Sequence, residues 1–161
     1  MMTDGLTLRR KWTFRAHGKQ VVFAKKKLEK NSHVLMKAFL WALYLPDYPD
    51  LSVEVPVGLR YRPDVVQVNQ SGAPVFWGES ERVSVRKIRY LLTRCRRTHF
   101  ALARWNTDLA PFETIVQKAM AGVGRQAPVD LLSFPADSTE RFISADGDIS
   151  IRLTDVTWIR L

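Results

Sequence analysis

The segment RYRPDVVQVNQSGAPVFWGES (residues 60–80) determines the fold that we expect for this chain. It contains two runs rich in β-branched and aromatic residues, 59–68 and 74–80, joined by a short turn rich in Asn, Ser and Gly. We therefore expect two neighbouring strands that pair with each other. Acidic residues interrupt both runs, Asp64 in the first and Glu79 in the second, although the chain as a whole is basic.

Outward from this pair of strands, the spacing of apolar residues predicts an α+β fold. Apolar residues recur at helical spacing in 33–45 and in 83–97, with three predicted strands between these helices and a fourth after them. The order is α-β-β-β-α-β over residues 31–105, which is typical of a mixed sheet flanked by helices. The four strands of this core are expected at 51–57, 59–68, 74–80 and 98–105. The other expected elements are an N-terminal β-hairpin of strands 7–16 and 20–28, a helix at 110–124, a strand at 129–134 and a C-terminal β-hairpin at 140–153 that turns at Asp146-Gly147.

The length and charge of the chain limit the classes of protein to consider. A chain of 161 residues suits one domain, here 1–161, with one core. The chain has 25 Lys and Arg against 16 Asp and Glu, a net charge of +9 and a pI near 10.1. This balance favours a polyanionic partner, nucleic acid first and an anionic membrane second.

The sequence has no feature of a secreted or membrane-spanning protein. Its longest apolar stretch, 34–45, contains Lys37 and is too short to cross a bilayer. The first residues have no apolar region of a signal peptide, so we expect a cytoplasmic protein without a membrane partner. The single cysteine, Cys95, allows neither an internal disulfide nor a cysteine-based zinc site.

The acids of the two strands form the candidate chemical site. In a strand at 74–80, alternation places Glu79 on one face together with Glu81 if the strand continues, and a short turn brings Asp64 close to Glu79. Carboxylates that close repel each other, and Mg²⁺ or Mn²⁺ relieves the repulsion while activating water for phosphodiester hydrolysis. The alternative is that these acids form surface ion pairs with arginines nearby in sequence, which are Arg60, Arg62 and Arg82.

The basic residues gather in two clusters. No acid is interleaved in the second cluster, so its charges gain no stabilisation from i,i+4 ion pairs, and contact with nucleic-acid phosphates is expected. A solvated helix face is the alternative interpretation. The first cluster precedes the helix at 33–45 and consists of Lys25, Lys26, Lys27 and Lys30. The second lies on the helix at 83–97 and consists of Arg86, Lys87, Arg89, Arg94, Arg96 and Arg97.

Several stretches, taken in order, resemble the YaeQ family, a bacterial group within the PD-(D/E)XK nuclease-like superfamily that has no firmly assigned activity. They are KLEKNSHVLMKAFLWAL (27–43), RPD (62–64), WGESERVSVRKIRYL (77–91) and FISADGDISIRLTDVTW (142–158). The resemblance covers nearly the whole chain. It implies a restriction-endonuclease-like α-β-β-β-α-β core and, as an expected activity, hydrolysis of nucleic acid.

Carried over by position, the resemblance assigns roles to individual acids. Asp64 matches the aspartate of PD, Glu79 matches the acid of (D/E)XK, and Glu29 matches an extra acid at the start of the first helix. These three residues would bind Mg²⁺ or Mn²⁺, with Glu81 as a further candidate ligand.

The sequence departs from the superfamily motif at its lysine. Glu81 stands where the motif has Lys, so the cation that would stabilise the attacking water and the phosphate is expected from Arg82, Arg86 or Lys87. The alternative is that the site is inactive or uses different electrostatics. Three functions remain open: a metal-dependent nuclease on DNA or RNA, a catalytically inactive nuclease-fold protein that binds nucleic acid through its basic helix, and a structural or protein-interaction role in which the charge serves solubility.

Overall fold

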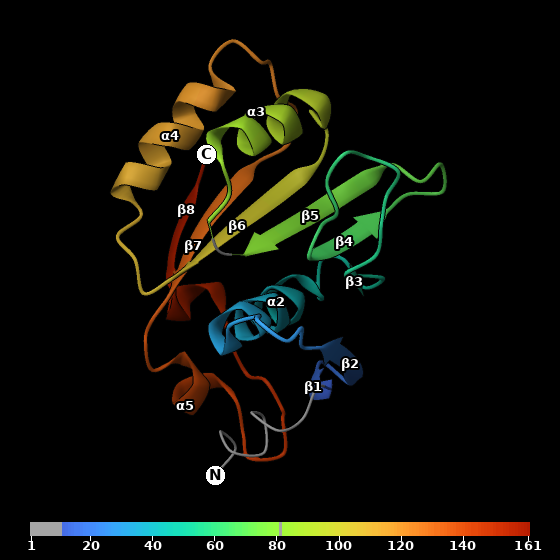
Figure 1. The fold of residues 1–161 in the computed structure, drawn as a ribbon, viewed down its shortest axis with the longest axis vertical. Helices are drawn as coiled ribbons and strands as arrows, with labels where there is room; N and C mark the ends of the chain where they lie inside the picture. The colour runs from blue at the N-terminus through green and yellow to red at the C-terminus, as the bar shows by residue number, and fades with distance from the viewer. Residues whose placement is uncertain (1–10, 81) are drawn as a thin grey trace.

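A computed structural model describes residues 11–80 and 82–161 and contains a six-stranded mixed sheet (Figure 1). The strand order is β3-β4-β5-β6-β7-β8; β5, β6 and β7 run parallel, and the strands outside them pair antiparallel. The strands are β3 (Ser52–Val53), β4 (Val65–Val68), β5 (Pro74–Ser80), β6 (His99–Trp105), β7 (Val129–Phe134) and β8 (Thr157–Arg160).

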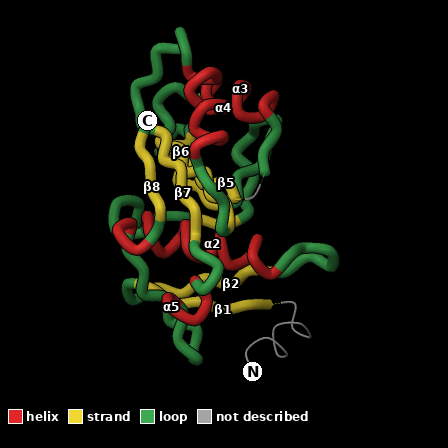
Figure 2. The backbone as a smooth tube through the Cα atoms, turned by 90° about the vertical axis from the view of Figure 1, so that its left-hand side faces the viewer, coloured by secondary structure: helices red, strands yellow, loops and turns green. Residues whose placement is uncertain are grey.

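Helices cover both faces of this sheet, as the side view in Figure 2 shows. One face is covered by α2 (Asn31–Tyr44), on which the separate hairpin of β1 (Lys11–Ala16) and β2 (Lys19–Ala24) packs. The other face is covered by α3 (Val85–Arg94) and α4 (Ala110–Met120). The short helices α5 (Ser138–Phe142) and η1 (Leu153–Asp155) lie between β7 and β8 in the chain.

Two apolar clusters, one on each face of the sheet, form the core of the described residues. Strand β5 shows why: Phe76 belongs to the cluster around α2, and Trp77, the next residue, belongs to the cluster under α3 and α4. Helix α2 is buried on most of its surface, as its nearly continuous apolar sequence predicts. The sheet is therefore a central layer, and residues at the end of β5 can be reached from both helical layers.

The predicted α-β-β-β-α-β order and the mixed sheet are confirmed, but the strand expected at 59–68 is much shorter. It starts only at Val65, after Pro63, which has no backbone N–H to donate to a ladder. Residues Leu59 and Tyr61 instead pack beside the apolar cluster under α3. This segment is thus a loop that borders α3.

Four other elements are also shorter than expected, and one of them is α4, which ends at Met120 instead of at the predicted residue 124. The strand predicted at 51–57 contains only Ser52–Val53, because the next residue, Glu54, has a positive φ of 55° and leaves the extended conformation. Helix α3 is shorter than the predicted 83–97. Of the N-terminal hairpin, residues 7–10 lie outside the described residues and β2 ends at Ala24.

The predicted C-terminal hairpin at 140–153 is present only as a turn. Its first residues belong to α5, and the Asp146-Gly147 turn is closed by one isolated bridge between Ile143 and Ile149. Two backbone hydrogen bonds of its own, from Ser144 to Asp148 and from Ser150 to Phe142, flank this bridge, and Gly147 and Ile149 also bond to the backbone of Arg15 in β1. The last strand of the chain, β8, joins the main sheet beside β7.

No helix among residues 11–80 and 82–161 is both long enough and apolar enough to cross a membrane.

A buried carboxylate ties α2 to three strands of the sheet. Asp130 on β7 accepts hydrogen bonds from the Tyr44 hydroxyl at 2.7 Å and from Arg160 Nε at 2.7 Å, and its Oδ2 lies 2.7 Å from His99 Nε2. Burial opposes ionisation of Asp130, but the hydrogen bonds from His99, Arg160 and Tyr44 outweigh it and hold the pKa of Asp130 below its usual value. The ionised Asp130 thus joins α2, β6 and β8 through one side chain.

Replacing this carboxylate should destabilise the whole fold. We expect Asp130→Ala to lower the free energy of unfolding by about 3 kcal/mol, because the buried hydroxyl and ring nitrogen lose their partner. The exposed ion pair of Asp148 with Arg15 provides a matched control, and Asp148→Ala should cost less than about 1 kcal/mol. Urea denaturation followed by circular dichroism measures both values, and equal losses for the two variants would contradict this role of Asp130.

Candidate functional site

The pairing of β4 with β5 brings Asp64 and Glu79 together at the end of the ladder. Val65 pairs with Gly78, and the backbone N–H of Asp64 donates to the carbonyl of Gly78 at 3.2 Å. Asp64 therefore lies across from Glu79, as the strand alternation and short turn predict. The negative charge of Asp64 acts on Glu79 and helps to raise its pKa.

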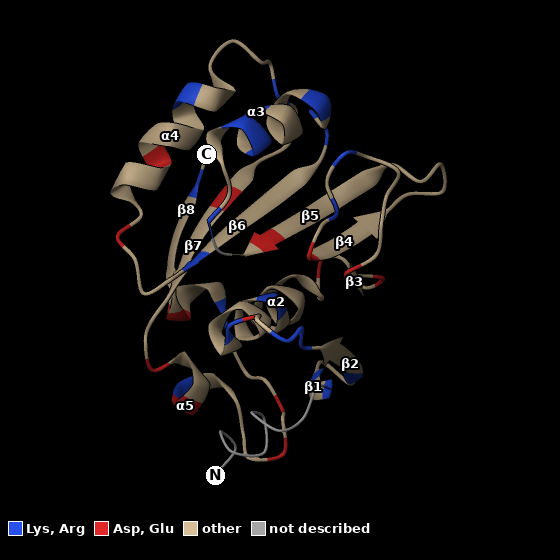
Figure 3. Cartoon of the chain, viewed as in Figure 1, with Lys and Arg blue, Asp and Glu red and all other residues tan. Residues whose placement is uncertain are grey.

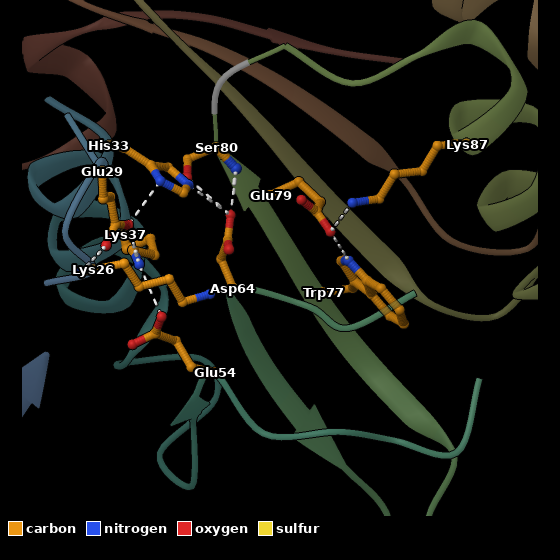
Figure 4. A network of polar contacts seen from close by, with 10 residues as sticks. All are labelled: Lys26, Glu29, His33, Lys37, Glu54, Asp64, Trp77, Glu79, Ser80 and Lys87. Carbon is orange, nitrogen blue, oxygen red and sulfur yellow. Dashed lines mark hydrogen bonds and ion pairs between the residues drawn. The ribbon is translucent and has the colours of Figure 1, made fainter. Parts of the chain in front are cut away.

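Glu79 is buried on the α3 side of the sheet. Its Oε1 accepts a hydrogen bond from Trp77 Nε1 at 3.0 Å and lies 3.0 Å from Lys87 Nζ (Figure 4). Burial, and then the charge of Asp64, raise the pKa of Glu79 to about 7, although Lys87 and Trp77 act in the opposite direction. Near neutral pH this carboxyl group is therefore partly protonated.

Asp64 is bound from the α2 side of the sheet. Its Oδ2 accepts hydrogen bonds from the backbone N–H of Ser80 at 2.9 Å and from the Ser80 hydroxyl at 2.8 Å, and it lies 3.6 Å from His33 Nε2. Burial opposes ionisation of Asp64, but His33 and Ser80 outweigh it and lower its pKa. Figure 4 shows Asp64 between His33 and Ser80 on one side and Glu79 on the other. The environments of the two carboxyl groups thus move their pKa values apart, a pattern found at many acid–base sites.

The second oxygen of each carboxyl group takes no part in these contacts. These atoms are Asp64 Oδ1 and Glu79 Oε2. Within residues 11–80 and 82–161, no group of three or more His, Cys, Asp or Glu side chains is arranged to hold a metal ion. Mg²⁺ usually binds through one or two carboxylates and takes its other ligands from water and phosphate. Burial is the largest cause of the raised pKa of Glu79, and the charge of Asp64 is the next one. A divalent cation would relieve this charge conflict between the two carboxyl groups.

Glu29, predicted as a metal ligand, lies just before α2 and forms ion pairs with basic side chains. Its Oε2 is 2.6 Å from Lys37 Nζ and 2.7 Å from His33 Nδ1. The side chain of Lys37 is 1% exposed, and its ammonium also contacts Glu54 at 3.0 Å. A buried ammonium requires such partners. Glu29 is therefore connected to Asp64 through His33 and does not contact Glu79.

Of the three cations predicted to replace the motif lysine, Lys87 is the one that contacts Glu79 in the described part of the chain. Arg82 and Arg86 are exposed. The charge of Arg82 acts on Arg104 instead and, after burial, helps to lower the pKa of the Arg104 guanidinium. Glu81, the other predicted ligand, lies outside the described residues.

Sequence reasoning missed His33 and Ser80, which contact Asp64 directly. Trp77, which strand alternation places on the face of Glu79, contacts that carboxylate as expected. Arg104, one strand away from Glu79, was also missed. Arg104 on β6 shares a face with Leu102, the register partner of Glu79, and stacks on the Phe112 ring at 3.9 Å. The signal for Arg104 was a charged residue in the otherwise apolar run 100–105. That Arg104 lies on the strand next to Glu79 could be identified only from the parallel register of β5 with β6.

The two basic clusters lie on different sides of the sheet (Figure 3). Lys25, Lys26, Lys27 and Lys30 precede α2, and the backbone N–H of Lys26 donates to Glu29 at 3.1 Å. On the other side, Lys87 turns toward Glu79 while the arginines of the second cluster are exposed and form no ion pair with any described residue. These arginines are Arg86, Arg89, Arg94, Arg96 and Arg97.

The fold and this pair of carboxylates define an α+β protein with a mixed sheet between two helical layers and an acidic centre at the end of a β-ladder. No protein-family model matches the sequence, and no curated protein matches it. Two solved structures are similar in fold. The YaeQ protein from Pseudomonas syringae aligns with a TM-score of 0.57 at 16% identity, over 84% of this chain and 71% of that one. The YaeQ protein from Xanthomonas axonopodis pv. citri aligns with a TM-score of 0.54 at 17% identity, over 82% of this chain and 76% of that one.

This chain therefore has the fold of the YaeQ proteins, as its sequence resemblance implies. At this level of identity the likeness concerns the fold, and the chemistry of the site must be judged from its own side chains.

The contacts of Glu79 predict how its pKa responds to substitution. We expect Asp64→Asn to lower the pKa from about 7, since a like charge is removed, and Lys87→Met to raise it, since an opposite charge is removed. Carbon-13 NMR of labelled glutamate carboxyl groups, assigned with Glu79→Gln, measures both shifts. Shifts in the same direction for the two variants would contradict the site geometry.

The raised pKa also sets the pH dependence of stability. The unfolded chain ionises Glu79 near 4.5, whereas the folded chain keeps the proton until about 7. The free energy of unfolding should therefore contain a contribution that falls as the pH rises from about 4.5 to about 7. Urea denaturation across this range should show the decline in the wild-type protein and a smaller decline in Glu79→Gln.

Proposed function

We propose that this protein is a divalent-metal-dependent phosphodiesterase that acts on nucleic acid, either DNA or RNA. The observation that supports this most is the distance of 3.0 Å between Lys87 Nζ and Glu79 Oε1. At the motif position of the lysine the chain has Glu81. An ammonium group is supplied instead by Lys87 of α3, which lies beside the carboxylate of Glu79. Asp64 and Glu79 thus provide two acidic groups at the end of one ladder, and Lys87 provides a cation beside Glu79.

The residues present fit a hard divalent cation. Asp64 and Glu79 would hold Mg²⁺ or Mn²⁺ through their oxygen atoms, and Glu79 would release its proton when the metal binds. When bound, the metal supplies a Lewis acid and a water molecule that ionises more readily.

The protein side chains around the carboxylates would orient them and supply positive charge. Lys87 donates to Glu79 and carries positive charge for a phosphate that approaches the pair. Ser80 and His33 hold Asp64 in its ionised form. The ring of Tyr61 lies 5.1 Å from Lys87 Nζ, at a distance that allows a cation–π interaction with that ammonium. These side chains are thus already positioned in the protein without substrate, which is the property of a preorganised site.

A second function is favoured by a different observation. The bonded oxygens of the two carboxylates turn to opposite sides of the sheet, one toward Ser80 and the other toward Lys87 and Trp77. Glu29 is also paired, through Lys37 and His33. A site whose acids are all bound by protein groups suits a catalytically inactive nuclease-fold protein that keeps its basic surface for nucleic acid.

Cleavage assays separate these two functions. We expect the wild-type protein to cleave labelled DNA or RNA with Mg²⁺ or Mn²⁺ and to lose all activity in EDTA. Glu79→Gln and Lys87→Met should each lower the rate by about 100-fold or more, whereas Lys118→Met on the exposed surface of α4 should leave it unchanged.

Calorimetry with Mn²⁺ adds a second readout for the same variants. Lys87→Met should retain Mn²⁺ binding, since the residue is not a metal ligand, and Glu79→Gln should lose it. Absence of both Mn²⁺ binding and cleavage in the wild-type protein, combined with binding of nucleic acid, would establish the inactive binding protein instead.

A further inference from the structure

A cleft of about 1010 Å³ opens beside the C-terminal half of α3. Its walls are α3, the loop around residues 57–59 and the turn between β4 and β5. A cleft of this volume is large enough for a ligand the size of a nucleotide. Its lining includes Val57, Leu59, Tyr90, Arg94 and Arg97.

The cleft combines an apolar surface with a cationic rim. Val57, Leu59 and Tyr90 are partly buried and pack against the apolar cluster under α3. Arg94 and Arg97 are exposed at the rim, and neither forms an ion pair within residues 11–80 and 82–161. Arg97 Nε donates to the neutral amide oxygen of Gln126 at 3.0 Å, which leaves the charge of this guanidinium uncompensated. An aromatic or apolar surface beside uncompensated guanidinium groups fits a planar base attached to a phosphate.

The segment that carries the rim arginines is held by a buried interaction. Arg125 Nη1 donates to the backbone carbonyls of Leu92 at 2.9 Å and Cys95 at 2.8 Å, and its Nη2 donates to the carbonyl of Thr98. The guanidinium also lies 5.1 Å from the centre of the Phe100 ring. One arginine thereby fixes the backbone from the last turn of α3 to the start of β6. The rim arginines are therefore presented from an ordered turn.

A row of side chains connects the cleft to the carboxylate pair. Lys87, which contacts Glu79, lies 5.1 Å from the Tyr61 ring, and Tyr61 packs edge-on against Tyr90 at 5.3 Å. Along α3, Lys87 and Arg94 are separated by about 10 Å. A short run of nucleotides bridges such a distance, so one strand could contact both places.

From these observations we infer that the cleft binds one base of a single-stranded nucleic acid and that Arg94 and Arg97 hold the neighbouring phosphates. The inference rests on the proposed function and deepens it, because it names the form of the substrate. A concave cleft with an aromatic wall admits a base only when that base is unstacked, as in single strands, whereas the bases of a duplex are paired and stacked inside it.

The test measures the binding of nucleic acid under conditions in which no metal-dependent cleavage can occur. A short fluorescein-labelled pyrimidine oligonucleotide, single-stranded or annealed to its complement, is titrated with the full-length protein in EDTA, with fluorescence anisotropy as the readout. We expect the single strand to bind at least about 10-fold more tightly than the duplex. Because EDTA removes divalent metal, the result does not depend on metal binding or cleavage, and failure of the proposed hydrolysis leaves it standing.

Three variants locate the contact. Arg94→Glu combined with Arg97→Glu should weaken single-strand binding at least about 10-fold and reduce the dependence of log K on log salt by about 1 to 2. The matched control, Lys118→Glu combined with Arg141→Glu, makes the same change in net charge at exposed positions outside the cleft and should change affinity less than about 3-fold. Tyr90→Leu keeps the wall apolar, removes the aromatic ring and should weaken binding about 10-fold.

The inference is overturned if the duplex binds as tightly as the single strand, if the two charge-reversal pairs weaken binding equally, or if no binding occurs at about 50 mM salt, where phosphate contacts are strong. Loss of affinity in the arginine pair with none in Tyr90→Leu would overturn the placement of a base in the cleft. Thermal denaturation of each variant confirms that the comparison involves folded protein.

Discussion

The antiparallel pairing of β4 with β5 is the constraint on which the rest of the site depends. It sets Asp64 across from Glu79, and α2 approaches this ladder closely at Gly78. A Cβ atom at that position would lie 3.3 Å from Cβ of Val65 and 3.4 Å from Cδ1 of Leu40. The absence of a side chain at Gly78 thus allows the helix, the shorter strand and β5 to meet without displacement.

The two carboxylates at the end of this ladder have different ionic contacts on the two sides of the sheet. On the α2 side, the charges form a closed set: Lys37 is paired with two acids, and His33 joins Glu29 to Asp64. On the α3 side, Glu79 meets one ammonium group, that of Lys87. The contacts on the α2 side therefore lower the pKa of Asp64 and keep it ionised. On the α3 side, burial and then the charge of Asp64 outweigh Lys87 and raise the pKa of Glu79.

Helix α3 contributes Lys87 to the carboxylate site and arginines to the exposed surface, because the residue at which the helix begins is fixed. The Ser84 hydroxyl accepts a hydrogen bond from the Lys87 backbone N–H at 3.1 Å and so caps the first turn. With this start, Lys87 points inward to Glu79, Ile88 faces the core and the arginines face outward. A shift of the helix start by one residue would rotate the whole set by about 100°, so that the ammonium at the site would be lost.

The sequence by itself determined the elements whose signal is periodic and local. The apolar residues of α2 and α3, the run 74–80 and the central α-β-β-β-α-β order follow from spacing alone, and the nearness of Asp64 to Glu79 follows from alternation and a short turn. Tertiary structure decided what those patterns leave open: that Glu29 pairs with Lys37, and that Arg104 lies one strand from Glu79. These depend on parallel register and on how α2 and α3 are oriented over the sheet, and such long-range contacts leave no periodic trace in the chain.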